Sequence, residues 1–453
     1  MPSTIDPVID FKRRNNAMTT QAENDILTQT GPGTPLGELA RHYWHPALKS
    51  EELVADGDPV RFMLMSEKLI AFRDSSGRIG VMDHRCPHRC ASLFFGRNEE
   101  NGIRCVYHGW KFDVEGNCLD MANVPPHQDF KQKVKAKAYK AEERNGVVWV
   151  YMGSQENVPG LPEIEATLCP EEDVEILFIV RECNWLQGAE GELDTSHLGV
   201  LHMGKVGADV YTKDSINQYV VSNRAPEYMF TETDFGTQYA AYRPADEGNT
   251  YWRLGPYLWP FWTMPPICPL DNNILARAYV PIDDENTMMV YWMHNKAELP
   301  GKTDRRKEVV GGGDWNFLPN TTDWNGRWRL SDNKKNDYNI DREVQRTKSY
   351  SGITGINLQD QAMSESMGEI VDRTVERLAP SDIMITQTRK HIIRAVQAYQ
   401  KDGTLPKSAT DPSVYRDVRG GQFVAPDGEE WLDAYSTRLD AAAVKPPLPE
   451  AAE

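Results

Sequence analysis

The chain has 453 residues and is 40% hydrophobic, which is enough for two domains with substantial cores. Its formal net charge of −17 argues against nucleic acid as a partner. No apolar run is long enough to cross a bilayer, and the amino terminus lacks a signal-peptide core. Seven scattered cysteines form no regular disulfide ladder and indicate a reducing, cytoplasmic compartment.

The first part of the chain predicts a flexible tail and then a small β domain. Residues 1–20 are polar and patternless, so we expect a flexible tail. Residues 21–155 begin with a turn-rich lead-in and continue as short β-type runs. The clearest of these runs and of the turns between them are 61–65, 69–72, 74–77, 115–117 and 146–151. We therefore predict an antiparallel all-β domain.

Two loops of this domain carry the pattern C-x-H-x16-C-x2-H, formed by Cys86, His88, Cys105 and His108. Each loop offers one thiolate and one imidazole. The thiolates can bind one iron of a [2Fe-2S] cluster and the histidines the other, which is the Rieske arrangement. Pro87 stiffens one loop, Gly109 lets the other pass close to the cluster, and Tyr107 can donate a hydrogen bond to a sulfur.

A structural zinc site is the alternative for these four residues, since zinc also binds two cysteines and two histidines. Zinc fingers usually pair Cys with Cys and His with His, whereas each loop here pairs Cys with His. The cluster is therefore favoured, and a zinc-stabilised binding module stays as an alternative.

The second domain, residues 156–440, is predicted to be α+β, an antiparallel sheet packed with helices. A strand is expected over 174–180 and a helix from about 184 to 202. Further strands are expected at 217–223, 227–232, 237–243, 250–256, 273–281 and 286–295, and further helices at 357–378 and 382–401. Residues 301–352 form a long excursion, either a lid, a subunit contact or a loop, and residues 441–453 a disordered tail.

The second domain contains the pattern D-x2-H-x4-H, at Asp194, His197 and His202. On a helix, Asp194 and His197 lie on one face. His197 and His202 would be splayed by about 140° on a regular helix. If both bind one metal, we expect a break or a π-type bulge around Gly199.

Two imidazoles and one carboxylate form the facial triad that binds Fe(II) in non-haem iron oxygenases. Asp360, at the start of a predicted helix, is the first candidate for the carboxylate. Glu365 and Asp372 compete with it, and spacing alone does not choose among the three. Each of them is also readable as a solvated helix charge.

The C-P-H-R and C-V-Y-H-G-W boxes, the D-x2-H-x4-H box and the Q-D-x4-E-S-M-G segment resemble those of the oxygenase subunits of Rieske non-haem iron oxygenases. The resemblance is stronger to the phthalate dioxygenase branch, which includes aromatic-acid O-demethylases, and runs from about residue 24 to 377. It implies a helix-grip catalytic domain, a [2Fe-2S] cluster on Cys86, His88, Cys105 and His108, and a mononuclear iron on His197, His202 and Asp360. Many relatives carry Gly where this chain has Cys90, a packed spectator or an oxidation liability.

The resemblance also implies an assembly and partners. In the family, this aspartate bridges a cluster histidine and an iron histidine of neighbouring subunits, so Asp194 would link His108 of one chain to His197 of the next in a homotrimer or a dimer of trimers. A separate reductase containing flavin and an iron–sulfur centre, with or without a ferredoxin, would supply electrons from NADH or NADPH. The chain lacks a Rossmann glycine fingerprint of its own.

The implied substrate is an aromatic acid, and the reaction is ring hydroxylation or O-demethylation with O₂. The aromatic run 251–264 can wall a flat pocket or belong to the sheet core. Arg253, Arg224, Arg243 and Arg277 are candidate carboxylate partners, although surface salt bridges are their commoner role. A Rieske electron carrier without oxygenase activity is a second alternative function.

Overall fold

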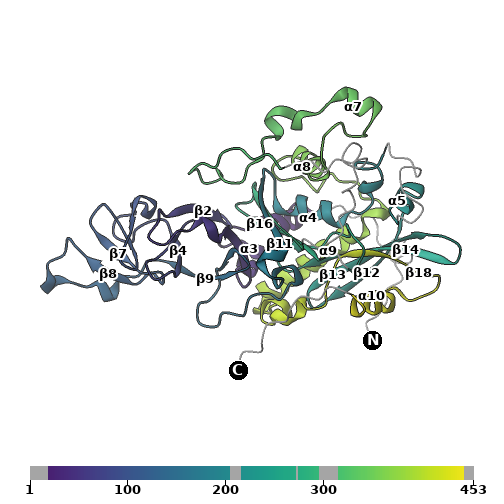
Figure 1. Ribbon diagram of the computed structural model, residues 1–453. Coiled ribbons are helices and arrows are strands. Elements are labelled where there is room, and N and C mark those ends of the chain that lie inside the picture. The colour runs from purple at the N-terminus through teal and green to yellow at the C-terminus, as the bar shows by residue number, and fades with distance from the viewer. Residues whose placement is uncertain (1–18, 205–215, 272–273, 295–314, 443–453) are drawn as a thin grey trace.

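The computed structural model describes residues 19–204, 216–271, 274–294 and 315–442. Most of the two predicted tails, residues 1–18 and 443–453, and residues 301–314 of the predicted excursion lie outside the described residues. The molecule is a wedge, with β7 and β8 at the narrow end and α4, α8 and β12 to β14 in the broad part (Figure 1). No helix among the described residues is long and apolar enough to cross a membrane.

The strands of the first domain are antiparallel, as the sequence predicts, and they form two sheets. One has the strand order β1-β10-β9-β4-β3-β2, and the other, at the narrow end, has the order β5-β6-β7-β8. The strands are β1 (Trp44–Lys49), β2 (Val60–Leu64), β3 (Glu67–Arg73), β4 (Ile79–Asp83), β5 (Arg97–Asn98), β6 (Ile103–Arg104), β7 (Trp110–Phe112), β8 (Cys118–Met121), β9 (Ala138–Arg144) and β10 (Val147–Tyr151). The expected turns at 74–77 and 115–117 are confirmed, with glycines at positive φ in both.

The second domain is built on one antiparallel sheet of order β11-β17-β16-β15-β14-β13-β12, and β18 pairs with β14. Its strands are β11 (Val174–Arg181), β12 (Glu227–Thr233), β13 (Gly236–Pro244), β14 (Asn249–Leu258), β15 (Trp262–Thr263), β16 (Leu275–Pro281), β17 (Thr287–His294) and β18 (Gly421–Pro426). Trp149 of β10 stacks on Trp262 and Trp292, with ring centroids 5.8 and 5.7 Å apart. The two domains therefore share one aromatic core, which includes Trp259 and Trp262 of the predicted aromatic run.

Helices α4, α8 and α9 position the residues of interest: α4 packs on β16, α8 on α4, and α9 on β13. A Cβ at Gly188 of α4 would lie 2.4 Å from the Tyr279 ring, so the helix sits directly on the sheet. The helices are α2 (Gln21–Thr28), α3 (Pro35–Ala40), α4 (Trp185–Leu193), α5 (Gln218–Ser222), α7 (Arg342–Thr347), α8 (Ile356–Ser366), α9 (Ile383–Asp402) and α10 (Trp431–Asp440).

Three sequence predictions of secondary structure are wrong. Residues 217–223 form the short helix α5 rather than a strand. The helix expected over 184–202 ends at Leu193, because Asp194 adopts an extended conformation with φ −76° and ψ 104°. The helix expected over 357–378 ends at Ser366, before Gly368 at φ +94°. The strands from 227 onward and the helix at 382–401 are confirmed.

The described part of the long excursion, residues 315–352, packs against both domains. The Trp324 ring contacts the His84 ring edge-on, with centroids 5.2 Å apart. Arg327 pairs with Glu52 at 2.5 Å, and Tyr338 donates to Glu365 of α8. Contacts of this segment therefore connect the cluster-candidate domain to α8, whereas α7 lies at the outer edge of the molecule (Figure 1).

Candidate functional site

The four cluster candidates, Cys86, His88, Cys105 and His108, lie on two loops with one backbone pattern. In the loop after β4, the Cys90 N–H donates to the Cys86 carbonyl at 2.9 Å. Between β6 and β7, the Gly109 N–H donates to the Cys105 carbonyl, also at 2.9 Å. Cys90 and Gly109 both have positive φ, 59° and 78°. The loops are therefore matched turns, each closing over its cysteine.

Cys90 is exposed, so the prediction of a packed spectator is wrong. A non-glycine residue at positive φ is strained, typically by about 1 kcal/mol or more. An exposed thiol in one of the cluster loops remains an oxidation liability.

The donor atoms are sorted into like pairs. Burial and the neighbouring Cys105 raise the pKa of the Cys86 thiol to about 12, so the two buried thiols adjoin. The His88 and His108 rings meet edge to face with centroids 4.5 Å apart, and Trp110 stacks on His88 at 4.4 Å. Burial, His108 and Arg89 lower the pKa of His88, which favours the neutral form that a metal needs.

One observation tests whether a cluster fits here. The Nδ1 atom of His108 is buried and has no hydrogen-bond partner in the structure. Buried polar atoms rarely lack a partner, so this nitrogen calls for a ligand outside the chain. A pair of adjacent thiols and a pair of adjacent imidazoles, one nitrogen of which is orphaned, fit the two unlike irons of a Rieske cluster.

The same geometry disfavours the zinc alternative. Four ligands of one tetrahedral zinc lie within about 4 Å of one another, since zinc–sulfur and zinc–nitrogen bonds are about 2.3 and 2.0 Å long. In the described part of the chain, the group of His, Cys and acidic side chains whose ligand atoms all lie within 4.8 Å is a different one, His197, His202 and Asp360. The four donors of the two loops are spread too widely for a single ion.

The D-x2-H-x4-H segment owes its shape to Asp194. Its carboxylate accepts hydrogen bonds from the backbone N–H and the hydroxyl of Ser196, both at 2.7 Å, and this turn ends α4. A short 3₁₀ turn follows over His197–Gly199, and the Met203 N–H then donates to the Leu198 carbonyl at 3.1 Å. The predicted irregularity around Gly199 is confirmed, but the helix breaks earlier, at Asp194.

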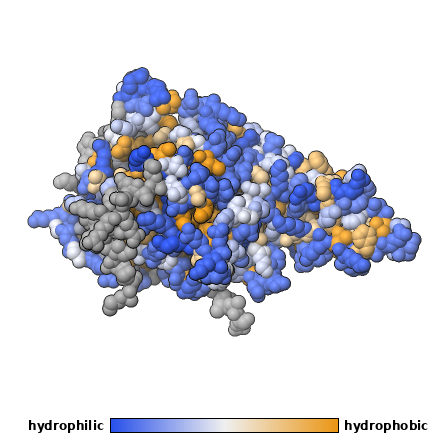
Figure 2. Space-filling model, turned by 180° about the vertical axis from the view of Figure 1, so that it is seen from behind, coloured by the Kyte–Doolittle hydropathy of each residue, from blue (hydrophilic) through white to orange (hydrophobic). Residues whose placement is uncertain are grey.

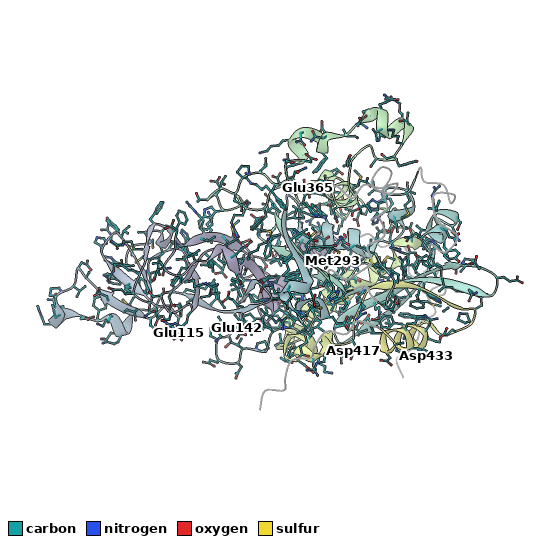
Figure 3. The ribbon with its side chains drawn as sticks, in the orientation of Figure 1. Glu115, Glu142, Met293, Glu365, Asp417 and Asp433 are labelled. Carbon is teal, nitrogen blue, oxygen red and sulfur yellow. The ribbon has the colours of Figure 1, made fainter. Side chains whose placement is uncertain are left out.

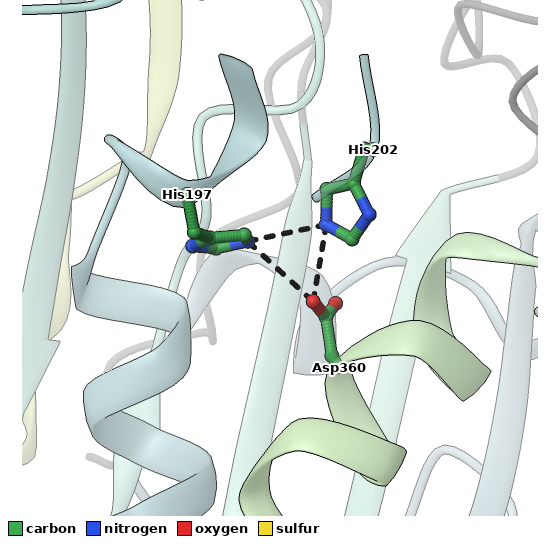
Figure 4. Close-up of side chains that lie close together, drawn as sticks. All are labelled: His197, His202 and Asp360. Atoms are coloured by element: carbon green, nitrogen blue, oxygen red, sulfur yellow. Dashed lines mark hydrogen bonds and ion pairs between the residues drawn. The ribbon is translucent and has the colours of Figure 1, made fainter. Parts of the chain in front are cut away.

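This irregular backbone brings His197 and His202 to one point with Asp360 of α8 (Figure 4). The Nε2 atoms of the two imidazoles are 3.1 Å apart. Asp360 Oδ1 lies 3.0 Å from His202 Nε2 and 3.4 Å from His197 Nε2. The two Nε2 atoms and the carboxylate oxygen thus converge, as the ligands of one cation would.

The structure separates Asp360 from its two competitors. Glu365 accepts hydrogen bonds from Tyr338, Gln361 and the Glu182 backbone. Asp372 accepts from the hydroxyl and the N–H of Thr374. Neither belongs to the group that meets the two histidines.

The charges of this group balance one another in the metal-free chain. Burial alone lowers the pKa of His197, but hydrogen bonds to Asp194 and Asp360 outweigh it and raise that pKa to about 10. Burial favours neutral Asp360, yet His202 and His197 hold its pKa well below the usual value. The group therefore carries at least one proton that a cation must displace.

The two candidate sites lie in different parts of the chain. In Figure 3, Glu115, which lies in the turn between β7 and β8, is near the narrow end, whereas Glu365, on the helix that carries Asp360, is in the broad part. The loops with the four cluster candidates belong to the narrow end and the His197 group to the broad part (Figure 1).

The candidate arginines have distinct surroundings. Arg224 is exposed and donates to the Gly204 carbonyl at 3.3 Å. Arg277 is buried and paired with Glu192. Arg253 is buried and donates to Thr195, Tyr251 and Gln422. Each of these three thus has a contact within the chain.

Arg243 differs from the others, because both terminal nitrogens are buried and have no hydrogen-bond partner in the structure. The side chain, in a residue only 1% exposed, donates through Nε alone, to the Asn223 carbonyl at 2.6 Å. Burial and the nearby Arg253 lower its pKa to about 10, which is still charged at neutral pH. A buried, charged and half-satisfied guanidinium calls for an anion.

Sequence reasoning missed three residues near these groups. Gln359 accepts from His202 Nδ1, and its place beside Asp360 in the Q-D pair was the available signal. The hydroxyls of Tyr228 and Tyr239 are buried without hydrogen-bond partners in the structure. Strand register puts them on the sheet face that carries Arg243, since Tyr228 pairs with Ala241, two residues from both Tyr239 and Arg243.

Comparison with known proteins identifies the family. Residues 43–138 match the model of the Rieske [2Fe-2S] domain, and residues 150–449 match that of the LigXa C-terminal domain-like family. The 3-chlorobenzoate-3,4-dioxygenase oxygenase subunit of Comamonas testosteroni is 47% identical over 93% of this chain and 99% of its own length.

Two further relatives and one solved structure agree. The phthalate 4,5-dioxygenase oxygenase subunit of Pseudomonas putida is 35% identical over 94% of this chain and 98% of its own length. The 5,5'-dehydrodivanillate O-demethylase oxygenase subunit of a Sphingobium species is 31% identical over 88% of each chain. A mutant of NdmA from Pseudomonas putida with theobromine shares the fold, with a TM-score of 0.54 at 17% identity, covering 87% of this chain and 99% of that one. The chain therefore belongs to the oxygenase subunits of the Rieske non-haem iron oxygenases.

Proposed function

We propose that this protein is the terminal component of a multicomponent system that uses O₂ to hydroxylate or O-demethylate an aromatic carboxylate. A separate NAD(P)H-dependent reductase, with or without a ferredoxin, supplies the electrons, and free cysteines throughout the described residues favour the cytoplasm. The relatives named for 3-chlorobenzoate, phthalate and dehydrodivanillate support the substrate class. One observation carries the proposal. The second domain contains both the His197, His202 and Asp360 group and a buried arginine, Arg243, whose terminal nitrogens have no hydrogen-bond partner in the structure.

In this proposal, Cys86, His88, Cys105 and His108 hold the Rieske cluster, and His197, His202 and Asp360 hold one Fe(II). When bound, the iron would supply O₂ activation and the cluster would supply electrons. His197 and His202 provide neutral Nε2 donors, and Asp360 provides the one negative charge of the triad. Three protein ligands of this kind would leave room at a bound iron for O₂ and substrate.

The raised pKa of His197 predicts a pH dependence of metal binding. Because this pKa is about 10 in the metal-free chain, a cation must displace a proton at any lower pH. Asp360 is already ionised throughout that range. Apparent Co(II) affinity, measured by competition with a chelator, is therefore expected to rise about tenfold per pH unit from about pH 6 to 8. A flat profile would contradict the proton at His197.

We also propose that the chain works as a head-to-tail homotrimer, alone or as a dimer of trimers. Asp194 contacts His197 Nδ1 at 3.5 Å, and its side chain is 23% exposed, so it is accessible to a second imidazole. In the trimer this imidazole is His108 of the neighbouring chain. A carboxylate between two imidazoles orients both rings and shortens the electron path.

Exposed apolar side chains support such an assembly. Figure 2 shows apolar surface at the narrow end, and the first domain exposes the apolar side chains of Phe95, Val106, Tyr107, Leu119 and Phe130. Four more exposed apolar side chains, Met363, Met367, Ile370 and Val375, lie at the end of α8 and in the segment that follows it. Exposed apolar surface of this kind is typical of interaction sites, and a heterologous contact between two different surfaces can close into a ring.

Mixing two inactive chains tests the assembly. A Cys86→Ser chain lacks the cluster and an Asp360→Ala chain lacks the iron, so each alone is expected to be inactive. When the two chains are co-expressed in equal amounts, they assemble into mixed trimers. In about a quarter of the interfaces, a chain with an intact cluster then faces a neighbour with an intact iron site. About a quarter of wild-type activity should therefore return. No recovery in mixed trimers verified by native mass spectrometry would show that electrons do not cross between chains.

The carboxylate of the substrate is proposed to bind Arg243. Both free terminal nitrogens of its guanidinium match the two oxygens of a carboxylate. Tyr228 lies close to the charges of both Asp194 and Arg243. Burial and Asp194 raise the pKa of its hydroxyl, and Arg243 opposes that shift. The tyrosine therefore lies between the proposed anion site and Asp194, and its buried hydroxyl and that of Tyr239 can donate to the same anion.

The experiment that tests the substrate class is a single turnover. Reduced, iron-loaded protein is mixed with O₂ and a panel of phthalate, chlorobenzoates and methoxybenzoates, each beside its neutral carboxamide. We expect product from acids and little from amides; a dihydrodiol indicates a ring dioxygenase, and a phenol with formaldehyde an O-demethylase. Equal turnover of acids and amides would refute the carboxylate requirement.

A further inference from the structure

We propose that Gln359 is a positioning residue that fixes the tautomer of His202 and so determines which nitrogen of that ring faces the metal. This inference rests on the proposed function, because it takes the His197, His202 and Asp360 group to be a metal site. It adds a residue outside that group, with a defined effect on one of its members.

The orientation of the Gln359 amide follows from its two contacts. Its Nε2 donates to the Ile353 carbonyl at 2.8 Å, so its Oε1 is the atom that faces His202 Nδ1, at 2.7 Å. An amide oxygen only accepts hydrogen bonds. The hydrogen of neutral His202 therefore lies on Nδ1.

The consequence is a lone pair at the opposite nitrogen. His202 Nε2 is the atom that lies 3.0 Å from Asp360 Oδ1 and 3.1 Å from His197 Nε2. With Nδ1 protonated, Nε2 of the neutral ring is free to bind a cation at this point.

Burial makes this contact hard to replace. Gln359 is 2% exposed and His202 is 4% exposed, so bulk water cannot take over as the acceptor. Gln359 and Asp360 are consecutive on α8, so a single helix sets both a carboxylate and the orientation of an imidazole. Loss of the acceptor would leave a buried N–H unsatisfied or let the ring turn over.

The two imidazoles are thereby held by unlike partners. His197 has a carboxylate, Asp194, at its Nδ1, whereas His202 has a neutral amide. An amide orients the ring without adding a negative charge to a buried site. At the Nδ1 positions, the charged partner, Asp194, thus contacts only His197, the histidine next to the proposed path of electrons.

The test compares Gln359→Leu with Gln361→Leu. Gln361 is a matched control, since it lies on the same helix, is 3% exposed, and bonds to Glu365 and the Val180 carbonyl rather than to an imidazole. Removing a hydrogen-bond partner of a metal-binding histidine typically costs 10- to 100-fold in metal affinity. We expect a loss of about this size in Fe(II) affinity for Gln359→Leu and under about threefold for Gln361→Leu.

A second variant and a spectroscopic signal keep the test decisive if Gln359→Leu does not fold. Gln359→Asn keeps the amide but is one methylene too short to reach His202, and it should show the same loss. With Cu(II) as the probe and the cluster oxidised, electron spin echo modulation from the remote imidazole nitrogens should change in Gln359→Asn and stay unchanged in Gln361→Leu. Wild-type affinity and modulation in Gln359→Asn would overturn the role of Gln359.

Asp360→Ala separates this inference from the proposed function. If Asp360→Ala loses the metal while both Gln359 variants keep it, Gln359 is not a positioning residue and the metal site stands. If Asp360→Ala also keeps the metal, the triad itself is wrong, and with it the proposed function.

Discussion

Replacing Asp360 by alanine is expected to remove the mononuclear iron and to bring oxygenase activity below detection, while the Rieske cluster remains. Asp360 provides the carboxylate oxygen that meets both Nε2 atoms, at 3.0 and 3.4 Å, and no other acidic side chain among the described residues joins that group. Without it, only the two imidazoles would remain to hold the Fe(II) ion. Iron analysis, the visible absorption of the cluster and single-turnover product together measure the three parts of this expectation.

Asp372→Ala is the matched control for that experiment. Asp372 competes with Asp360 in the sequence, but in the structure it bonds to Thr374. Its replacement should leave iron content and turnover at wild-type levels. Full iron and full activity in Asp360→Ala would contradict the iron site, and loss of iron in Asp372→Ala would move the carboxylate elsewhere.

Replacing Arg243 by methionine is expected to lower kcat/KM for an aromatic carboxylate by roughly a hundredfold, about 3 kcal/mol, because a buried carboxylate loses its charged partner. Methionine fills most of the volume and introduces no unpaired polar atom. The loss should be much smaller for the matching carboxamide, which carries no charge to be paired. Steady-state rates for the acid and the amide, measured side by side, give the two values.

Arg224→Met is the control for Arg243→Met, since Arg224 is exposed and bonds only weakly to the Gly204 carbonyl. It should change kcat/KM for the acid by less than about threefold, as expected for a solvated charge. An equal loss for acid and amide in Arg243→Met would mean that Arg243 supports the fold rather than the substrate. A large loss confined to Arg224→Met would assign the carboxylate to that residue.

The cluster loops were readable from sequence because their chemistry is local. The four candidate ligands lie within two short turns, and the Cys–His spacing reflects the backbone of those turns directly. The antiparallel strands were predictable for a similar reason, since short apolar runs such as β10 and β17 are typical of buried strands.

The helix boundaries were less accessible, because side-chain contacts decide them. α4 ends at Leu193 because the Asp194 carboxylate accepts a hydrogen bond from the Ser196 backbone. The periodicity of the sequence does not predict this end of the helix. The irregular turn that follows is what lets two histidines five residues apart meet. Sequence spacing predicted an irregular backbone around Gly199, but not that the helix already ends at Leu193.

The candidate carboxylate ligand and the proposed anion site depend on tertiary packing. Asp360, Glu365 and Asp372 are alike in sequence, and only the packing of α8 on α4 separates them. Arg243, Arg253 and Arg277 are likewise all buried arginines of one sheet, and what distinguishes Arg243 is the partner it lacks. An unmet hydrogen-bonding need is a property of three-dimensional structure.

The most direct test of the proposed function is one isotopic measurement. Anaerobically reduced, iron-loaded protein is mixed with ¹⁸O₂ and, in separate reactions, with 3-chlorobenzoate, phthalate or a methoxybenzoate. The masses of the products of a single turnover are then determined by mass spectrometry. For at least one acid we predict one of two results. A hydroxylated product carries ¹⁸O from molecular oxygen, or O-demethylation gives a phenol and formaldehyde, whose ¹⁸O is lost by exchange with water. Oxidation of the cluster without any oxygenated or demethylated product from any of these acids would contradict the proposal.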